Sequence, residues 1–185
     1  MALNEAGHAP NRWYADQDGN IHLNGSTLYT DELGASIVGA SSGKVVNCTA
    51  STLAVTEALH SNRIITLNRA AGIAVTLPTA AAGLHFRFIV GTTFTGAASI
   101  KSATGADVMI GHALMGNNSD NTVVDWPAIA SNTFDTIDML GTGNSTGGMA
   151  GQEIEIIGLA ANLWFVSIRG DAAGSEATPF ADTVT

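Results

Sequence analysis

The feature of this 185-residue chain that most constrains its fold is a series of short β-type runs beginning near Lys44. Apolar residues often occupy every second position of a run, and glycine, asparagine, serine or proline separates one run from the next. Successive side chains of a strand point to opposite faces, so this alternation predicts half-buried strands. The expected strands are residues 52–57, 63–67, 73–77, 85–90, 99–101, 107–110, 134–140, 152–157 and 163–168.

Three of these runs carry the clearest local signals. Residues 73–77 alternate and stop at Pro78, which cannot donate a hydrogen bond to a β-ladder. Residues 85–90 place two phenylalanines and a valine on one face, with His85 and Arg87 on the other. The last two runs are joined by a short connection that ends in the turn-compatible Asn162, and they predict a hairpin.

About ten short strands with regularly spaced turns predict an all-β fold. We expect a single antiparallel β-sandwich or β-barrel of the jelly-roll-like kind. The segment most compatible with a helix, Thr79–Ala82, is only one turn long. A parallel α/β fold is not expected, because no amphipathic segment of about ten residues lies between the strands.

The first part of the chain has a different texture. Residues 1–43 are polar and aperiodic, and a few large side chains stand isolated among Asn, Gly, Asp and Ser. The change occurs near Ser41–Gly43, where small turn-forming residues cluster. We therefore expect an extended polar N-terminal arm over residues 1–43 and a β-sandwich or barrel body over residues 44–185.

Composition excludes several classes of function. Sixteen acidic residues against seven basic ones give a net charge of −9, so a surface that neutralises nucleic-acid phosphates is not expected. Apolar runs are far shorter than the roughly 20 residues that span a bilayer. The N-terminus also lacks the apolar stretch of a signal peptide. We expect neither a nucleic-acid nor a membrane partner.

The chain has one cysteine, Cys48, which cannot form an internal disulfide. Its neighbours Val45, Val46 and Thr49 are β-branched. Free cysteine is among the most buried residue types. We expect Cys48 to be a small buried apolar residue.

The most enzyme-like motif is Gly143–Gly147, which places Ser145 at nucleophile-elbow spacing. An elbow needs a helix directly after the serine. The glycine-rich residues 147–151 cannot begin one, so a glycine-rich hairpin loop is the favoured interpretation. A hydrolase on a β scaffold is the least favoured alternative, and we predict no catalytic residue and no cofactor.

Metal binding is not expected either. Asp16–Asn20 resembles the start of a calcium loop, but the position for the bidentate glutamate holds Thr27, so an Asp-Gly turn is favoured. Glu153 and Glu155 share a strand face without forming a recognisable hydrolytic pair. No histidine has a second ligand at metal-site spacing; the five are His8, His22, His60, His85 and His112.

Aromatic residues fall into two groups. Those in β runs are expected in the core, namely Phe86, Phe88, Phe134, Trp164 and Phe165. Trp13, Tyr14, Tyr29 and Trp126 lie in irregular segments instead. Because a large side chain in a polar arm has no local core, we expect it to contact a neighbouring chain. The candidate interface residues are Trp13, Tyr14, Ile21, Leu23 and Tyr29.

Several short motifs occur in the same order as in a group of structural proteins of tailed-bacteriophage particles. The first has the form strand, Leu-Asn, Ala-Ala-Gly, strand, Thr-Leu-Pro. The matching segments are Ile64–Pro78, Ile100–Gly111, Asp135–Ile137, Thr146–Gly148, Gly151–Glu155, Trp164–Val166 and Pro179–Phe180. The chain resembles this group over residues 44–181, and the group includes head decoration (cement) proteins and other virion proteins.

The resemblance implies a non-enzymatic virion protein that binds the outer surface of the capsid as a homotrimer and stabilises the head. Its partners would be itself and the major capsid protein, and its location the exterior of the virion. The acidic net charge agrees with an outward-facing surface. The alternative is a fibre, baseplate or receptor-binding module that recognises carbohydrate, with Trp126 as the candidate contact.

Overall fold

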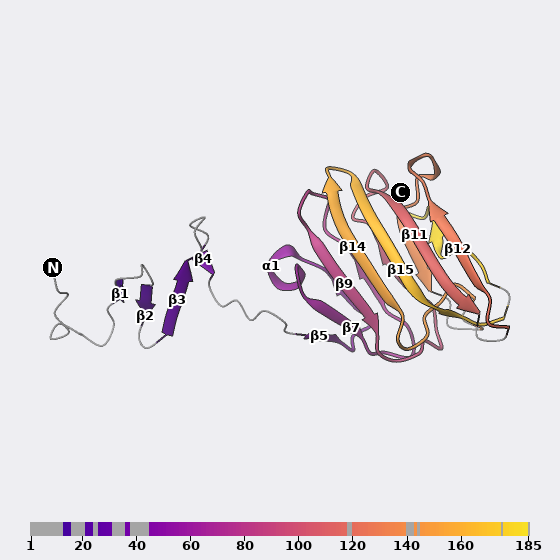
Figure 1. Ribbon diagram of the computed structural model, residues 1–185, viewed down its shortest axis with the longest axis horizontal. Helices are drawn as coiled ribbons and strands as arrows, with labels where there is room; N and C mark the ends of the chain where they lie inside the picture. The colour runs from indigo at the N-terminus through magenta and orange to yellow at the C-terminus, as the bar shows by residue number, and fades with distance from the viewer. Residues whose placement is uncertain are drawn as a thin grey trace. The chain divides into compact units, whose positions relative to one another are not determined.

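The computed structural model describes residues 45–117, 120–139, 143, 145–174 and 176–184, together with the backbone of four short strands between residues 13 and 37 (Figure 1). The chain divides into two units, Met1–Ser42 and Gly43–Thr185. Among the described residues, no helix has the length and apolar character needed to cross a membrane.

The N-terminal unit contains a four-stranded antiparallel sheet in the order β1-β2-β3-β4. The sequence pattern predicts no strand here, because these runs have only two to five residues and little alternation. We expect residues 1–43 to form an arm that contacts a neighbouring chain. This contact stays a prediction. The strands are β1 (Trp13–Ala15), β2 (Ile21–Leu23), β3 (Ser26–Thr30) and β4 (Ser36–Ile37).

The second unit, which we call the body, consists of two sheets. The larger has the strand order β12-β11-β15-β14-β9-β7-β5 and the smaller has the order β16-β13-β10-β8-β6. The larger sheet comprises β5 (Val45–Cys48), β7 (Ile64–Leu67), β9 (His85–Val90), β11 (Val108–Asn117), β12 (Val123–Ala128), β14 (Glu153–Ala160) and β15 (Leu163–Ala172). The smaller comprises β6 (Thr52–Ala54), β8 (Ala74–Thr76), β10 (Ala98–Lys101), β13 (Thr136–Met139) and β16 (Phe180–Ala181).

The all-β prediction is confirmed, and so is the hairpin, formed by β14 and β15. Helical structure in the described residues is limited to two single turns, α1 (Glu57–His60) and the 3-10 turn η2 (Ala130–Asn132). The helical turn therefore lies at the end of the run expected as strand 52–57, and Thr79–Ala82 is not helical.

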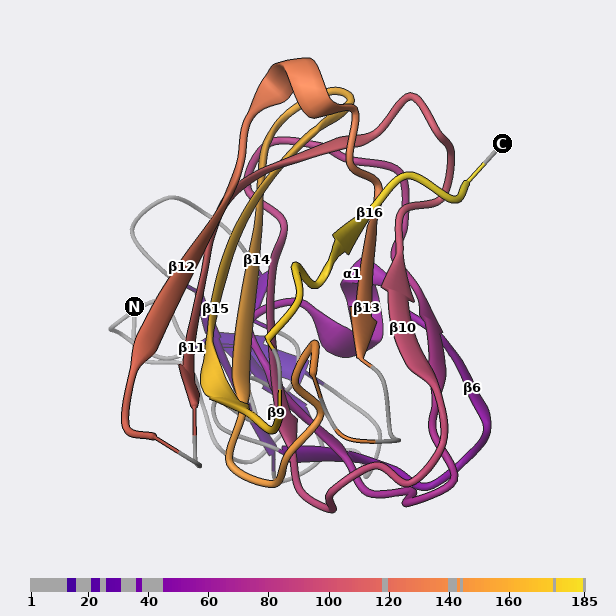
Figure 2. The same cartoon turned by 90° about the vertical axis from the view of Figure 1, so that its right-hand side faces the viewer.

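The prediction of antiparallel sheets is wrong, because both sheets are mixed. Strands β5, β7 and β9 run parallel in the larger sheet, and β6, β8 and β10 run parallel in the smaller one. Figure 2 shows the two sheets as two layers, with β9 in one and β6 and β10 in the other. From β5 to β10 the chain passes back and forth between them, so neighbours in one sheet are separated by a strand of the other. Parallel neighbours need a crossover, and here it is a strand instead of the usual helix.

One hydrophobic core receives residues from both sheets. At its centre the rings of Phe86 and Trp164 lie 6.0 Å apart, and both side chains are fully buried. Cys48 is buried and free, which confirms its prediction as a small core residue. Trp126 lies in β12 and packs against this core, so placing it in an irregular segment was incorrect.

Close approach of β11 to β15 depends on Gly111, which has φ +141°. A Cβ atom at this position would lie 1.8 Å from the carbonyl oxygen of Val166 on β15. Because only glycine adopts such a conformation without steric cost, this residue type is required where the two strands meet.

Candidate functional site

The glycine-rich segment around Ser145 lacks the structural context of a nucleophile elbow. Ser145 and Thr146 lie in a turn, and the next residues, 147–151, contain no helix. Three glycines there have positive φ: Gly147, Gly148 and Gly151. The Gln152 side chain accepts a hydrogen bond from the Gly148 amide and holds the loop in place. Asn144 of the motif lies outside the described residues.

The three histidines with described side chains each have a different partner. The His60 Nδ1 atom accepts a hydrogen bond of 3.0 Å from the Thr56 amide, and His85 Nε2 lies 3.0 Å from Glu155 Oε1. The Nδ1 atom of His112 lies 3.3 Å from Asp125. Among the described residues, no group of three or more potential ligands could hold a metal ion. His8, the side chain of His22 and the turn 16–20 lie outside them.

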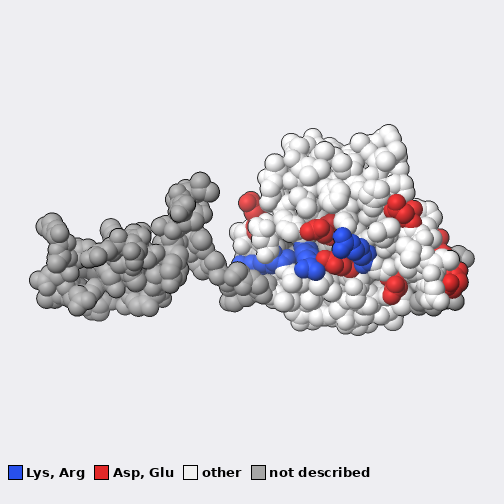
Figure 3. Space-filling view, viewed as in Figure 1, with Lys and Arg blue, Asp and Glu red and all other residues white. Residues whose placement is uncertain are grey.

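Charged side chains form a paired band on the outer face of the larger sheet (Figure 3). Arg87 Nε donates to Glu153 Oε1 at 2.6 Å, beside the contact between His85 and Glu155. Arg169 is the cross-strand neighbour of Glu153 on β15. Glu153 and Glu155 thus share a face as predicted, and each faces a basic partner. Partly exposed pairs of this kind contribute about 0–1 kcal/mol each.

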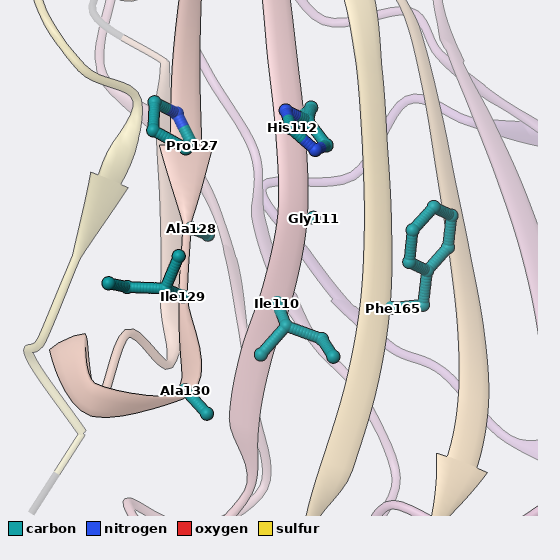
Figure 4. Close-up of a pocket in the computed structure, with 8 residues that line it drawn as sticks. All are labelled: Ile110, Gly111, His112, Pro127, Ala128, Ile129, Ala130 and Phe165. Carbon is teal, nitrogen blue, oxygen red and sulfur yellow. The ribbon is translucent and has the colours of Figure 1, made fainter.

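A shallow apolar hollow of about 380 Å³ lies beside this band, over β11, β12 and β15 (Figure 4). The lining residues are Ile110, Gly111, His112, Pro127, Ala128, Ile129, Ala130 and Phe165. His112 is the titratable residue of the lining, and its partner Asp125 comes from the neighbouring strand. The hollow can therefore receive an apolar group with one polar pair near it.

The hollow corrects the interpretation of Phe165, which was expected in the core. Residues of β15 alternate, so Trp164 and Val166 are buried while Phe165 is half-buried on the outer face. Sequence reasoning also missed Ile110 and Ile129, since the hollow forms only where β11 and β12 lie beside the distant strand β15. The alternation in β15 was the available signal for Phe165.

The candidate interface residues all lie in the small N-terminal sheet, but not on one face. Strand register places Trp13 opposite Leu23, and Ile21 opposite Leu28. These positions share a face because paired and next-but-one residues of a sheet do so. Tyr14 and Tyr29 fall on the opposite face. The side chains of all these residues lie outside what the structure describes.

Trp126 does not provide the exposed ring that a carbohydrate contact would need. Its side chain is partly buried against the core, and its indole Nε1 is buried without a hydrogen-bond partner. An inward-facing indole cannot stack on a ligand at the surface. The candidate contact named for the carbohydrate alternative is therefore not supported.

Two carboxyl groups of the body have shifted pKa values. Burial raises the pKa of Asp138 on β13, and the nearby charge of Lys101 partly opposes the rise. Hydrogen bonds from the Thr122 hydroxyl and amide lower the pKa of Asp120. Neither group lines the hollow.

Comparisons of the chain with protein-family models, with curated proteins and with solved structures found no match. Fold and surfaces define an all-β protein with two mixed sheets, a paired charged band and a shallow apolar hollow. Any assignment of function therefore rests on the sequence and structure of this chain.

Proposed function

We propose that the protein is a non-enzymatic structural component of a tailed-bacteriophage particle, which decorates the outer surface of the capsid as a homotrimer. The order of motifs over residues 44–181 supports this proposal. Those motifs are structural in the body, since Ile64–Pro78 spans β7 and β8 and Trp164–Val166 lies within β15. We further propose that the body is a β-sandwich, because residues from both sheets join one core.

The observation that carries the proposal is the strand register of the N-terminal sheet. This register gathers Trp13, Ile21 and Leu23 with Leu28 on one face. Apolar residues gathered on one face of a sheet favour burial of that face against another layer. In a particle, a neighbouring subunit or the capsid would supply this layer, and aromatic and aliphatic anchors are suited to such contacts.

Charge and symmetry agree with an exterior role. The net charge of −9 keeps the surface hydrated without attracting packaged nucleic acid. Weak contacts repeated over a symmetric shell add up through avidity, so no single strong site is needed.

The proposal predicts that the full chain is a trimer in solution scattering. Deleting residues 1–30 should weaken binding to capsids while the body stays folded. Leu23→Asp should also weaken binding, because it places a charge on the apolar face, whereas Thr27→Asp on the opposite face is the matched control. A folded monomer, or full capsid binding by the shortened chain, would contradict the proposal.

A second candidate function is carbohydrate recognition by a fibre, baseplate or receptor-binding module. The observation in its favour is the hollow, where Phe165 and Ile110 offer apolar surface close to the polar pair of His112 and Asp125. Such a combination suits the C–H face and hydroxyls of a sugar. Glycan-array binding that Phe165→Ala abolishes would support this function, and a few copies per particle instead of hundreds would favour it over capsid decoration.

A further inference from the structure

Two strands that are consecutive in the chain, β5 and β6, form the edges of the two sheets at one end of the body. β5 is the last strand of the larger sheet and β6 is the last strand of the smaller one. The two strands are consecutive and are joined only by residues 49–51. Within the described part of the chain, no strand pairs with the outer side of either.

Among the described residues, nothing pairs with the main-chain groups on the outer edge of β5. The Asn68 amide donates to the Cys48 carbonyl at 2.8 Å, so Cys48 and, two residues earlier, Val46 face β7. In a parallel ladder the intervening residues direct both their N–H and C=O to the other side. Val45 and Asn47 therefore face away from the sheet, ready to pair with another strand.

Strand β6 has the same arrangement. The Ala74 amide donates to the Ser51 carbonyl at 2.9 Å, and the Val55 amide donates to the Thr76 carbonyl at 2.8 Å. Leu53 lies midway between Ser51 and Val55 and likewise faces β8. Main-chain groups of its two neighbours, Thr52 and Ala54, point outward.

The core is also incompletely covered at this end. Val46 and Leu53 pack against the core but are only partly buried. Their cross-strand neighbours one layer further in, Ile65 and Val75, are 0% and 1% exposed. Val45 is 54% exposed at the same edge. Unpaired edges with apolar residues are surfaces on which further strands assemble.

We propose that this end of the body binds the same end of a second copy of the chain through a two-fold axis. β5 pairs antiparallel with β5 of the partner subunit, and β6 pairs with its own counterpart. For all three residues of β6 to pair, the two-fold axis must pass beside Leu53, which then lies opposite Leu53 of the partner subunit. Thr52 of each copy then lies opposite Ala54 of the partner subunit. Both sheets then continue from one copy into the next.

A second copy fits this end better than a single extended peptide, because a peptide would cover only one of the two edges. The same surface on another copy offers two edges at a matching separation, which is the self-complementarity that a two-fold interface requires. The opposite edge of the larger sheet is less suited, since β12 contains Pro127, which has no N–H to donate.

This contact does not depend on a role in capsids. A trimer formed through other surfaces would be joined to a second trimer, and a monomer would become a dimer. Failure of capsid binding and failure of the two-fold contact are therefore separate results.

Single-cysteine cross-linking of the full chain tests the geometry, with Cys48→Ala as the background. In a non-hydrogen-bonded antiparallel pair the Cα atoms lie roughly 4.5 Å apart, which is within disulfide range. Leu53→Cys should form a covalent dimer on mild oxidation. Val123→Cys is the matched control, because the native Val123 side chain on β12 is 69% exposed. Cross-linking of Leu53→Cys no faster than that of the control would overturn the proposal.

Sedimentation of charge variants tests the same contact without a cross-link. Val45→Lys and Thr52→Lys place charges on the two edges while leaving the intrachain ladders intact, and edge lysines oppose strand addition. Self-association should weaken by roughly tenfold or more, as for charges buried in an interface. Val123→Lys should associate like the native chain. Native chain that stays unassociated, or Val45→Lys that associates normally, would also overturn the proposal.

Discussion

At the scale of single residues, buried carboxylates hold distant segments of the body in place through hydrogen bonds to main-chain amides. Asp135 is fully buried, and its carboxylate accepts hydrogen bonds from the Thr183 and Val184 amides at 2.9 and 3.1 Å. Asp107 is equally buried and accepts a bond from the Ala80 amide at 3.3 Å. Each carboxylate thus fastens a segment distant in sequence. Sequence patterns give no signal for such partners, because the residues are 27 to 49 positions apart.

Asp138 gives a prediction about pH. Burial raises the pKa of its carboxyl above the ordinary value of 3.8, so between the two values the folded protein binds more protons than the unfolded chain. Its contribution to the free energy of unfolding therefore falls as pH rises through that window. Asp138→Asn should remove this fall in the free energy of unfolding. At pH values above the raised pKa, the variant should therefore be more stable than the native protein.

Urea unfolding between about pH 3 and pH 7 checks the Asp138 prediction, because the ordinary carboxyl pKa lies inside this range. Asp171→Asn, at an exposed position of β15, is the control for exchanging an aspartate for an asparagine in a strand. A difference between Asp138→Asn and the native protein that does not change with pH would contradict the raised pKa.

At the scale of elements, the local pattern predicts strands but not their neighbours. Alternation identified residues 85–90 and 163–168, where buried and half-buried residues follow each other. Strand β12 was missed because Pro127 interrupts its pattern, and proline is tolerated there only because the strand lies at an edge. The parallel pairing of β5, β7 and β9 has no local signature, since each crossover is itself a strand.

The C-terminal segment is an element whose position depends on one residue. β16 pairs with β13 over only two residues, and the bonds to Asp135 hold Thr183 and Val184 beyond it. Asp135→Ala should cost about 1–3 kcal/mol of stability, because two part-buried amides and the buried Thr136 hydroxyl lose their acceptor. Hydrogen exchange at Thr183 and Val184 should accelerate more than exchange in β14.

Asp182→Asn is the matched control for Asp135, since Asp182 accepts only from the exposed Thr133 hydroxyl. A surface change of this kind should stay within about 0.5 kcal/mol. Equal exchange rates at Thr183 in Asp135→Ala and in the native protein would show that the β16 pairing alone holds the segment.

At the scale of the whole molecule, the body folds around a core shared by both sheets. Phe88 on β9 and Ile100 on β10 are both fully buried in it. A shared core couples the two sheets, so we expect them to unfold together.

Phe88→Ala tests this coupling. It should destabilise the body by about 3–5 kcal/mol, the usual cost of removing a buried phenylalanine. On a Trp13→Phe background, tryptophan fluorescence reports on Trp126 and Trp164 of the body. This signal and far-UV circular dichroism should give one coincident urea transition. Two separate transitions within the body would contradict a shared core.

The sequence by itself determined that this is an all-β protein, where most strands begin, that Cys48 is buried, and that Glu153 and Glu155 share a face. These features follow from side-chain alternation and turn residues, which act over a few positions. Tertiary structure alone decided the mixed sheets, the packing of Trp126 against the core, the hollow around Phe165 and the places of β5 and β6 at the ends of their sheets. Each of these depends on which strands become neighbours, and packing between distant segments settles that choice.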